Sequence, residues 1–142
     1  MQATEKDQYV EFGIEAEQYA IRIHDIHEII KMQEITQIPS VKPYVKGVIN
    51  LRGKIVPVLS LRKLFGMEEA PAEKSTRIVV VNHLEDTVGI IVDRVNKVAT
   101  FSDIQPPPDR VGGIDGNFFV GIGLTAGGLV GILRLDEVLL HE

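Results

Sequence analysis

The sequence predicts a mainly β protein built as two small barrels of about five strands each, with only short helices. The first observation is that apolar, β-branched runs alternate with turn residues along most of the chain. The second is a weak internal repeat, in which residues 19–26 resemble 88–95 and residues 53–61 resemble 127–135. Because closure into a barrel removes exposed strand edges, two barrels account for both observations.

Three pairs of strand-like runs are expected to form hairpins, because a short polar or glycine-rich turn separates the two runs of each pair. Apolar residues alternate with polar ones in the first pair, whereas the second is apolar enough to be buried on both faces. The pairs are 9–14 with 19–23, 77–81 with 88–92, and 117–124 with 129–135. The order of the hairpins does not decide which strand closes which barrel.

Helices are predicted to be few and short: two helices, and a single turn between the prolines of residues 39–44. Residues 61–65 precede Gly66, a residue that commonly ends a helix. Residues 136–140 begin with an acidic turn, which suits the positive end of a helix dipole. The segments 67–75 and 105–117 are expected to be loops, the second because it contains three consecutive prolines and two glycines.

The length of 142 residues favours one domain made of two lobes. The repeat divides the chain into approximate lobes at 15–70 and 71–140, and leaves open whether the lobes exchange strands. A groove between two lobes is a favoured place for a binding site.

The composition excludes several classes of function. Fifteen basic and 20 acidic residues give a net charge of −5, which argues against nucleic acid as a partner. The absence of cysteine excludes disulfides and thiolate metal sites. No apolar stretch approaches the ~18 residues of a membrane span, and the polar N-terminus does not resemble a signal peptide. We therefore expect a cytoplasmic protein that does not insert into the membrane.

Three motifs resemble catalytic, cofactor or metal sites, and each lacks a feature that such a site requires. His24 and His27 would diverge on an extended chain, and a third metal ligand is missing apart from their acidic neighbours. Residues 121–126 fit a loose dinucleotide-binding pattern, but a turn and a strand follow where a helix is required. The serines lack a glycine-framed nucleophile turn. We expect no enzymatic activity, no cofactor and no metal.

The most informative segment is 47–61, where Arg52 stands between two apolar runs and Gly53 follows it. An arginine at such a turn is either a solvated surface residue or a cation held by a carboxylate for docking. Glu28, which apolar residues flank on both sides, is the candidate partner.

These residues resemble the CheW family, the coupling proteins of bacterial chemotaxis. The resemblance is carried by Val45-Lys46-Gly47-Val48-Ile49-Asn50-Leu51-Arg52-Gly53, by the Ile26-His27-Glu28-Ile29 run and by residues 88–95. It spans one domain from about residue 8 to 140 and leaves residues 1–7 as a flexible N-terminus. The chain length favours a stand-alone coupler over a fused one.

The resemblance implies two five-stranded barrels of the SH3-like type and a non-enzymatic scaffold. Its implied partners are the regulatory domain of the histidine kinase CheA and the cytoplasmic tip of methyl-accepting chemoreceptors, with recruitment to membrane-bound receptor clusters. The implied binding residues are Ile26, Glu28, Gly47, Asn50, Arg52 and Gly53. The second lobe lacks the Asn-Leu-Arg-Gly motif, so only the first should present this arginine. The alternative is a coupling-type or small-molecule-binding domain of another two-component pathway.

Overall fold

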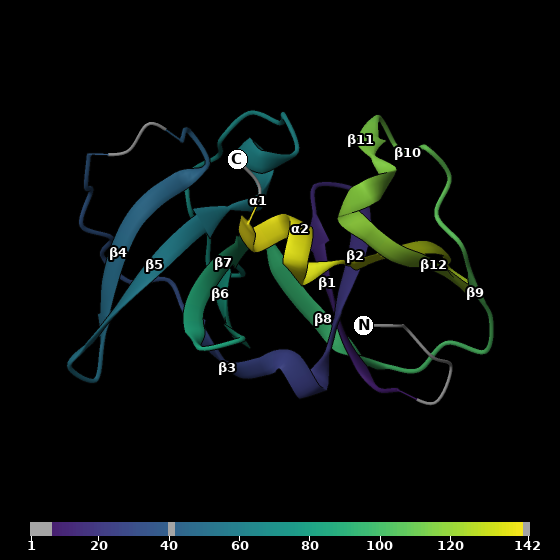
Figure 1. The fold of residues 1–142 in the computed structure, drawn as a ribbon, viewed down its shortest axis with the longest axis horizontal. Coiled ribbons are helices and arrows are strands. Elements are labelled where there is room, and N and C mark those ends of the chain that lie inside the picture. Colours follow the sequence, from purple (N-terminus) through teal and green to yellow (C-terminus); the bar gives the residue numbers. More distant parts are fainter. Residues whose placement is uncertain (1–6, 40–41, 141–142) are drawn as a thin grey trace. The chain divides into compact units, whose positions relative to one another are not determined.

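The computed structural model describes residues 7–39 and 42–140 (Figure 1). The chain divides into two compact units. Unit 1 comprises the described residues of Met1–His24 and Val95–His141, and unit 2 comprises those of Asp25–Arg94. The predicted flexible N-terminus at 1–7 lies, apart from Asp7, outside the described residues.

Unit 1 contains a six-stranded sheet in the order β8-β1-β2-β13-β12-β9. The strands pair antiparallel in the hairpins β1–β2 and β12–β13, and β13 runs parallel to β2. The strand bounds are β1 Tyr9–Ile14, β2 Glu17–Arg22, β8 Arg94–Ala99, β9 Ile104–Gln105, β12 Phe119–Thr125 and β13 Gly128–Leu133. Unit 1 also has a separate two-stranded ladder and three short helices. The ladder strands are β10 Arg110–Val111 and β11 Ile114–Asp115, and the helices are η1 Ile23–Asp25, η2 Gly116–Phe118 and α2 Leu135–Leu140.

Unit 2 contains a five-stranded sheet in the order β3-β6-β7-β5-β4. The hairpins β6–β7 and β4–β5 are antiparallel, and β5 runs parallel to β7. The elements are β3 Ile26–Lys31, β4 Val45–Leu51, β5 Lys54–Ser60, α1 Leu61–Leu64, β6 Arg77–His83 and β7 Asp86–Val92. The side chain of Ser60 caps α1 by accepting from the backbone N–H of Lys63 at 3.2 Å.

The two sheets repeat one strand order, with β8, β1, β2, β13 and β12 corresponding to β3, β6, β7, β5 and β4. One outer strand of each sheet directly follows, in the chain, a hairpin that belongs to the other sheet. β3 leaves the β1–β2 hairpin and pairs with β6, while β8 leaves the β6–β7 hairpin and neighbours β1. The chain thus crosses between the units twice.

The predicted mainly β fold is confirmed, as are the three hairpins and the two short helices. Closure of each sheet into a barrel stays a prediction. The expected loop at 105–117 is wrong in part, because residues 110–115 form the β10–β11 ladder. The strand expected from residue 117 begins at Phe119, because the Asp115 carboxylate accepts from the backbone N–H of Asn117 at 2.9 Å and caps η2 instead.

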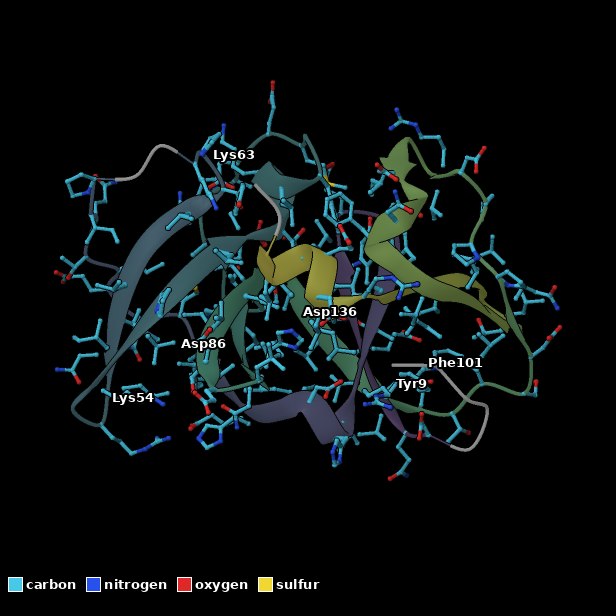
Figure 2. The ribbon with its side chains drawn as sticks, viewed as in Figure 1. Tyr9, Lys54, Lys63, Asp86, Phe101 and Asp136 are labelled. Atoms are coloured by element: carbon cyan, nitrogen blue, oxygen red, sulfur yellow. The ribbon has the colours of Figure 1, made fainter. Side chains whose placement is uncertain are left out.

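The cores of the two units differ in composition. The core cluster of unit 1 is partly aromatic: Tyr9 and Phe101 lie with ring centroids 5.1 Å apart (Figure 2) and pack with small and aliphatic residues. Tyr19 stacks at 6.0 Å from Phe12 and at 6.2 Å from Phe119. The core cluster of unit 2 is aliphatic and consists of Ile49, Val56, Val58, Ile78 and Val80.

Candidate functional site

All six residues predicted to bind a partner lie in unit 2. Ile26 and Glu28 are on β3, Gly47 and Asn50 are on β4, and Arg52 with Gly53 forms the turn between β4 and β5. β3 and β4 are the two outer strands of this sheet, and a side-chain contact between Arg52 and Glu28 nevertheless joins the β4–β5 turn to β3.

The turn between β4 and β5 has a backbone suited to a tight hairpin. Arg52 has φ 52° and Gly53 has φ 85°, so both lie in the left-handed region that a two-residue turn of this hand requires. The Asn50 side-chain oxygen accepts from the backbone N–H of Gly53 at 2.8 Å, which braces the turn. Left-handed backbone is unfavourable for arginine, so the residue is kept here at a conformational cost.

The Arg52 guanidinium donates to the Glu28 carboxylate through Nη2 and Oε2. The Arg52 side chain is 65% exposed and that of Glu28 is 25% exposed, so the pair stands at the surface with the arginine outermost. The hydrogen bond from Arg52 holds the pKa of Glu28 below its ordinary value despite the opposing effect of desolvation. The same bond raises the pKa of Arg52. Both groups are therefore charged at neutral pH.

Gly47 has a structural reason to be glycine. A Cβ atom there would lie 2.1 Å from the backbone oxygen of Thr36, and its φ is 148°. Thr36 forms an isolated bridge to Val48, with both N–H···O distances at 2.9 Å. Gly47 thus allows the chain after β3 to approach β4.

Polar residues that sequence reasoning missed surround the pair. His27 Nε2 lies 3.3 Å from Glu28 Oε2, and His27 Nδ1 lies 3.4 Å from Asn82 Nδ2. Among the described residues, no group of three or more His, Cys, Asp or Glu side chains could hold a metal ion. Since Asn82 is on β6, only the β3–β6 pairing brings it to His27. In the sequence, the polar residues around the β6–β7 turn were the only indication that Asn82 could take part in a polar site.

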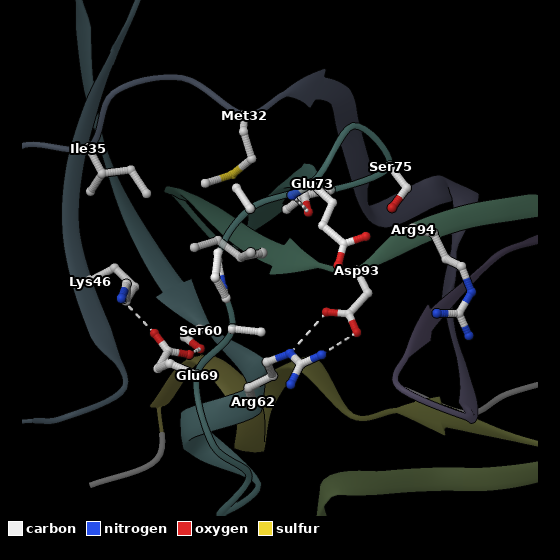
Figure 3. Close-up of a pocket in the computed structure, with 15 residues that line it drawn as sticks. Met32, Ile35, Lys46, Ser60, Arg62, Glu69, Glu73, Ser75, Asp93 and Arg94 are labelled. Carbon is white, nitrogen blue, oxygen red and sulfur yellow. Dashed lines mark hydrogen bonds and ion pairs between the residues drawn. The ribbon is translucent and has the colours of Figure 1, made fainter.

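A second feature of unit 2 is a pocket of about 410 Å³ (Figure 3). Its charged lining is largely paired internally: Lys46 lies 2.6 Å from Glu69, and Arg62 binds Asp93 through two contacts of 3.0 and 2.6 Å. Desolvation raises the pKa of Glu69, but the hydrogen bonds from Lys46 and Ser60 outweigh it and leave the pKa below its ordinary value. A ligand entering the pocket would compete with these pairs.

The comparisons with known proteins bear on the family. The model of the CheW-like domain matches residues 8–142. The chain belongs to the CheW family. A chemotaxis protein CheW from Helicobacter pylori is 39% identical over 134 residues, covering 93% of this chain and 81% of the relative. One from Treponema pallidum is 36% identical over 124 residues, covering 83% and 73%. The crystal structure of the scaffolding protein TtCheW from Thermoanaerobacter tengcongensis matches with a TM-score of 0.84 at 38% identity, covering 91% and 84%.

Membership of the CheW family confirms the predicted fold family and the prediction of a non-enzymatic chemotaxis scaffold. Within the described residues, the structure has no helix that is both long and apolar enough to span a bilayer.

Proposed function

We propose that this CheW-family chain couples the histidine kinase CheA to methyl-accepting chemoreceptors by binding both. The observation that carries the proposal is Arg52, an exposed arginine held by Glu28 on a braced turn with left-handed backbone. Strained backbone at a well-supported surface position supports a functional role, because folding alone would favour glycine there.

The geometry suits recognition of an acidic group on a partner. A guanidinium carries five N–H donors in a planar fork, and Glu28 uses only part of them. The Glu28 contact also restricts the rotation of a long side chain, which lowers the entropy lost when a partner binds. Ile55, which is 62% exposed one residue beyond Lys54, adds apolar area beside the turn.

The six predicted binding residues then have different proposed roles: they are Ile26, Glu28, Gly47, Asn50, Arg52 and Gly53. Arg52 contacts the partner and Glu28 orients it. Asn50 and Gly53 shape the turn, and Gly47 admits Thr36 beside β4. Ile26, whose register partner is Val81, begins the strand that carries Glu28. Recruitment of the chain from the cytoplasm to receptor clusters follows from the same contacts.

The test is a three-component assembly experiment. The chain, the CheA regulatory domain and a receptor cytoplasmic fragment are combined in pairs and together, and complexes are detected by calorimetry and size-exclusion chromatography. A coupler forms both binary complexes and raises the amount of kinase domain that elutes with the receptor fragment. Binding to neither partner would overturn the proposal.

The pocket in unit 2 supports a second candidate, a small-molecule-binding domain of another two-component pathway. A thermal-shift screen with metabolites and nucleotides distinguishes the two, since a ligand at 100 times its Kd stabilises the folded state by about 2.7 kcal/mol. Stabilisation by a small molecule without binding to CheA or receptor would favour the second candidate.

A further inference from the structure

A continuous row of polar side chains crosses unit 2 and ends at the coupling pair. Lys54 Nζ donates to Thr87 Oγ1 at 2.9 Å, and Thr87 Oγ1 donates to Asn82 Oδ1 at 3.0 Å. The row continues from Asn82 Nδ2 to His27 Nδ1 at 3.4 Å and from His27 Nε2 to Glu28 Oε2 at 3.3 Å. Figure 2 labels Lys54, its starting residue, near the free end of the β4–β5 hairpin.

The hydrogen bonds from Lys54 to His27 have a consistent direction. An ammonium group can only donate, so the Thr87 hydroxyl accepts from Lys54 and donates its own O–H to the Asn82 carbonyl oxygen. The Asn82 amide nitrogen then faces His27 Nδ1, which makes Nδ1 the acceptor. A neutral His27 therefore carries its proton on Nε2, the atom that lies 3.3 Å from Glu28 Oε2.

The backbone is adapted to place His27 in this row. The register of β3 against β6 shifts between Ile26 and Glu28, which makes His27 the extra residue of a bulge. Bulges re-aim side chains and are frequent beside functional sites. Here the bulge lets adjacent residues of one strand, His27 and Glu28, contact each other through their side chains.

The same carboxylate oxygen, Glu28 Oε2, receives both Arg52 and His27. A carboxylate held by Arg52 alone could follow the movements of that exposed side chain. The contact with His27, whose side chain is 47% exposed, limits the positions open to the carboxylate, and the carboxylate in turn limits those of the guanidinium. Pre-organisation of this kind raises affinity without adding any contact to the partner.

We propose that His27 and Asn82 are positioning residues for the Glu28–Arg52 pair, and that they raise the affinity for a partner by holding Arg52 in its binding orientation. This inference rests on the proposed coupling function. It is distinct from that function because neither His27 nor Asn82 has to touch the partner.

The decisive experiment is a double-mutant cycle on partner affinity. His27→Ala and Asn82→Ala are each measured in the wild-type chain and in a Glu28→Gln background, against the receptor fragment and the CheA regulatory domain. In the wild-type background each change weakens binding about three- to tenfold, the range of coupling between contacting residues. In the Glu28→Gln background the loss disappears, because the positioning residues act only through Glu28.

Two further variants separate positioning from general destabilisation. His27→Gln keeps an amide N–H that can reach Glu28, so it recovers most of the affinity lost in His27→Ala. His24→Ala removes an exposed histidine of η1 and leaves the affinity unchanged. A loss of affinity that persists in Glu28→Gln, or His27→Ala binding as tightly as wild type, overturns the proposal.

A readout without any partner keeps the inference separate from the coupling proposal. The titration of the Glu28 carboxyl carbon is followed by NMR in the free protein. In His27→Ala its midpoint rises toward the ordinary value for glutamate, because the Coulombic effect of His27, which adds to the hydrogen bond from Arg52 in lowering that pKa, has been removed. If wild type binds neither partner, the coupling function fails. This titration then decides alone whether His27 holds Glu28, and an unchanged midpoint overturns that.

Discussion

The two units share a strand order and have corresponding hairpins, β4–β5 in unit 2 and β12–β13 in unit 1. Of these two hairpins, only β4–β5 has an arginine at its turn. In unit 2 the β4–β5 turn is Arg52-Gly53, and in unit 1 the corresponding β12–β13 turn is Ala126-Gly127. The internal repeat, continued by two residues, puts Lys97 of β8 where Glu28 stands in β3. By this correspondence, a cation at the unit 1 turn would have a lysine as its counterpart in place of a carboxylate. The repeated strand order therefore carries the Glu28–Arg52 pair in unit 2 alone among the described residues.

The glycines before the two turns show a second difference. Gly47 and Gly121 occupy the same place relative to the turn, and a register shift precedes each of them. A Cβ at Gly47 would meet the backbone oxygen of Thr36 at 2.1 Å, whereas one at Gly121 would meet the side chain of Ile104 at 2.7 Å and a backbone oxygen, that of Gln105, only at 3.2 Å. A side chain can rotate away and a backbone oxygen in a ladder cannot, so unit 2 is the more constrained at this point.

The largest expected effect is on stability. Gly47→Ala should lower the free energy of unfolding by about 3 kcal/mol, because overpacking against backbone adds to unfavourable φ. Gly121→Ala should cost about 1 kcal/mol, since Ile104 can adjust. Urea denaturation of both variants measures the difference. Equal losses would show that the two units tolerate a side chain here alike.

The next effect is on binding. Arg52→Ala should weaken the complex with the receptor fragment or the CheA domain about 30-fold, as loss of a central arginine does at interfaces. Its urea midpoint should stay close to that of the wild type, because the arginine side chain is 65% exposed. Loss of binding that tracks a loss of stability would instead make Arg52 structural.

A graft provides the matched control for that prediction. Ala126→Arg, added to Arg52→Ala, places an arginine at the unit 1 turn. It should not restore affinity, because Lys97 stands there in place of Glu28. Restored affinity would show that the turn alone, without its carboxylate, is enough for coupling.

A smaller effect is expected at alkaline pH in unit 1. Burial, reinforced by Glu17 and Glu15, raises the pKa of Tyr19 from 10.0 to about 12. The folded state holds the Tyr19 proton more tightly than the unfolded state does. The contribution of Tyr19 to the free energy of unfolding is therefore complete below pH 10.0 and is lost as the pH rises toward about 12. Near pH ~11 the loss should be about 1 kcal/mol. Tyr19→Phe should remove this decline in stability. An equal decline in that variant would show that another group causes it.

The smallest effect is expected at acid pH in unit 2. The pKa of Glu69 is lowered in the folded state, so the contribution of this carboxylate to stability is complete above the ordinary pKa of glutamate and is lost as the pH falls through the lower folded pKa. Glu69→Gln should flatten the acid side of the stability curve by a few tenths of a kcal/mol, which is typical of a partly exposed pair. Thermal melts from neutral pH downward test this. An unchanged acid slope would mean that the Lys46 contact contributes nothing.

Much of the local structure could be predicted from the sequence. Alternating apolar residues and short polar turns identify a hairpin, because both strands and the turn are adjacent in the chain. The pairing of residues 9–14 with 17–22, and the helix after Ser60, were accessible for this reason. The sequence of residues 50–53 indicates a turn that presents an arginine, and the apolar residues around Glu28 are enough to predict it as the partner that the structure shows.

Only the tertiary structure decided which strands lie together. The parallel pairs β2–β13 and β5–β7, and the crossing of β3 and β8 between the units, join segments far apart in sequence. No local pattern encodes such contacts, because each depends on burial summed over the whole sheet. The row from Lys54 to Glu28 draws on four strands, so it could not be predicted. The sequence by itself determined the hairpins, the turn and its arginine. The fold decided that Asn82 lies beside His27 and that His27 contacts Glu28, because only the tertiary structure determines which strands become neighbours.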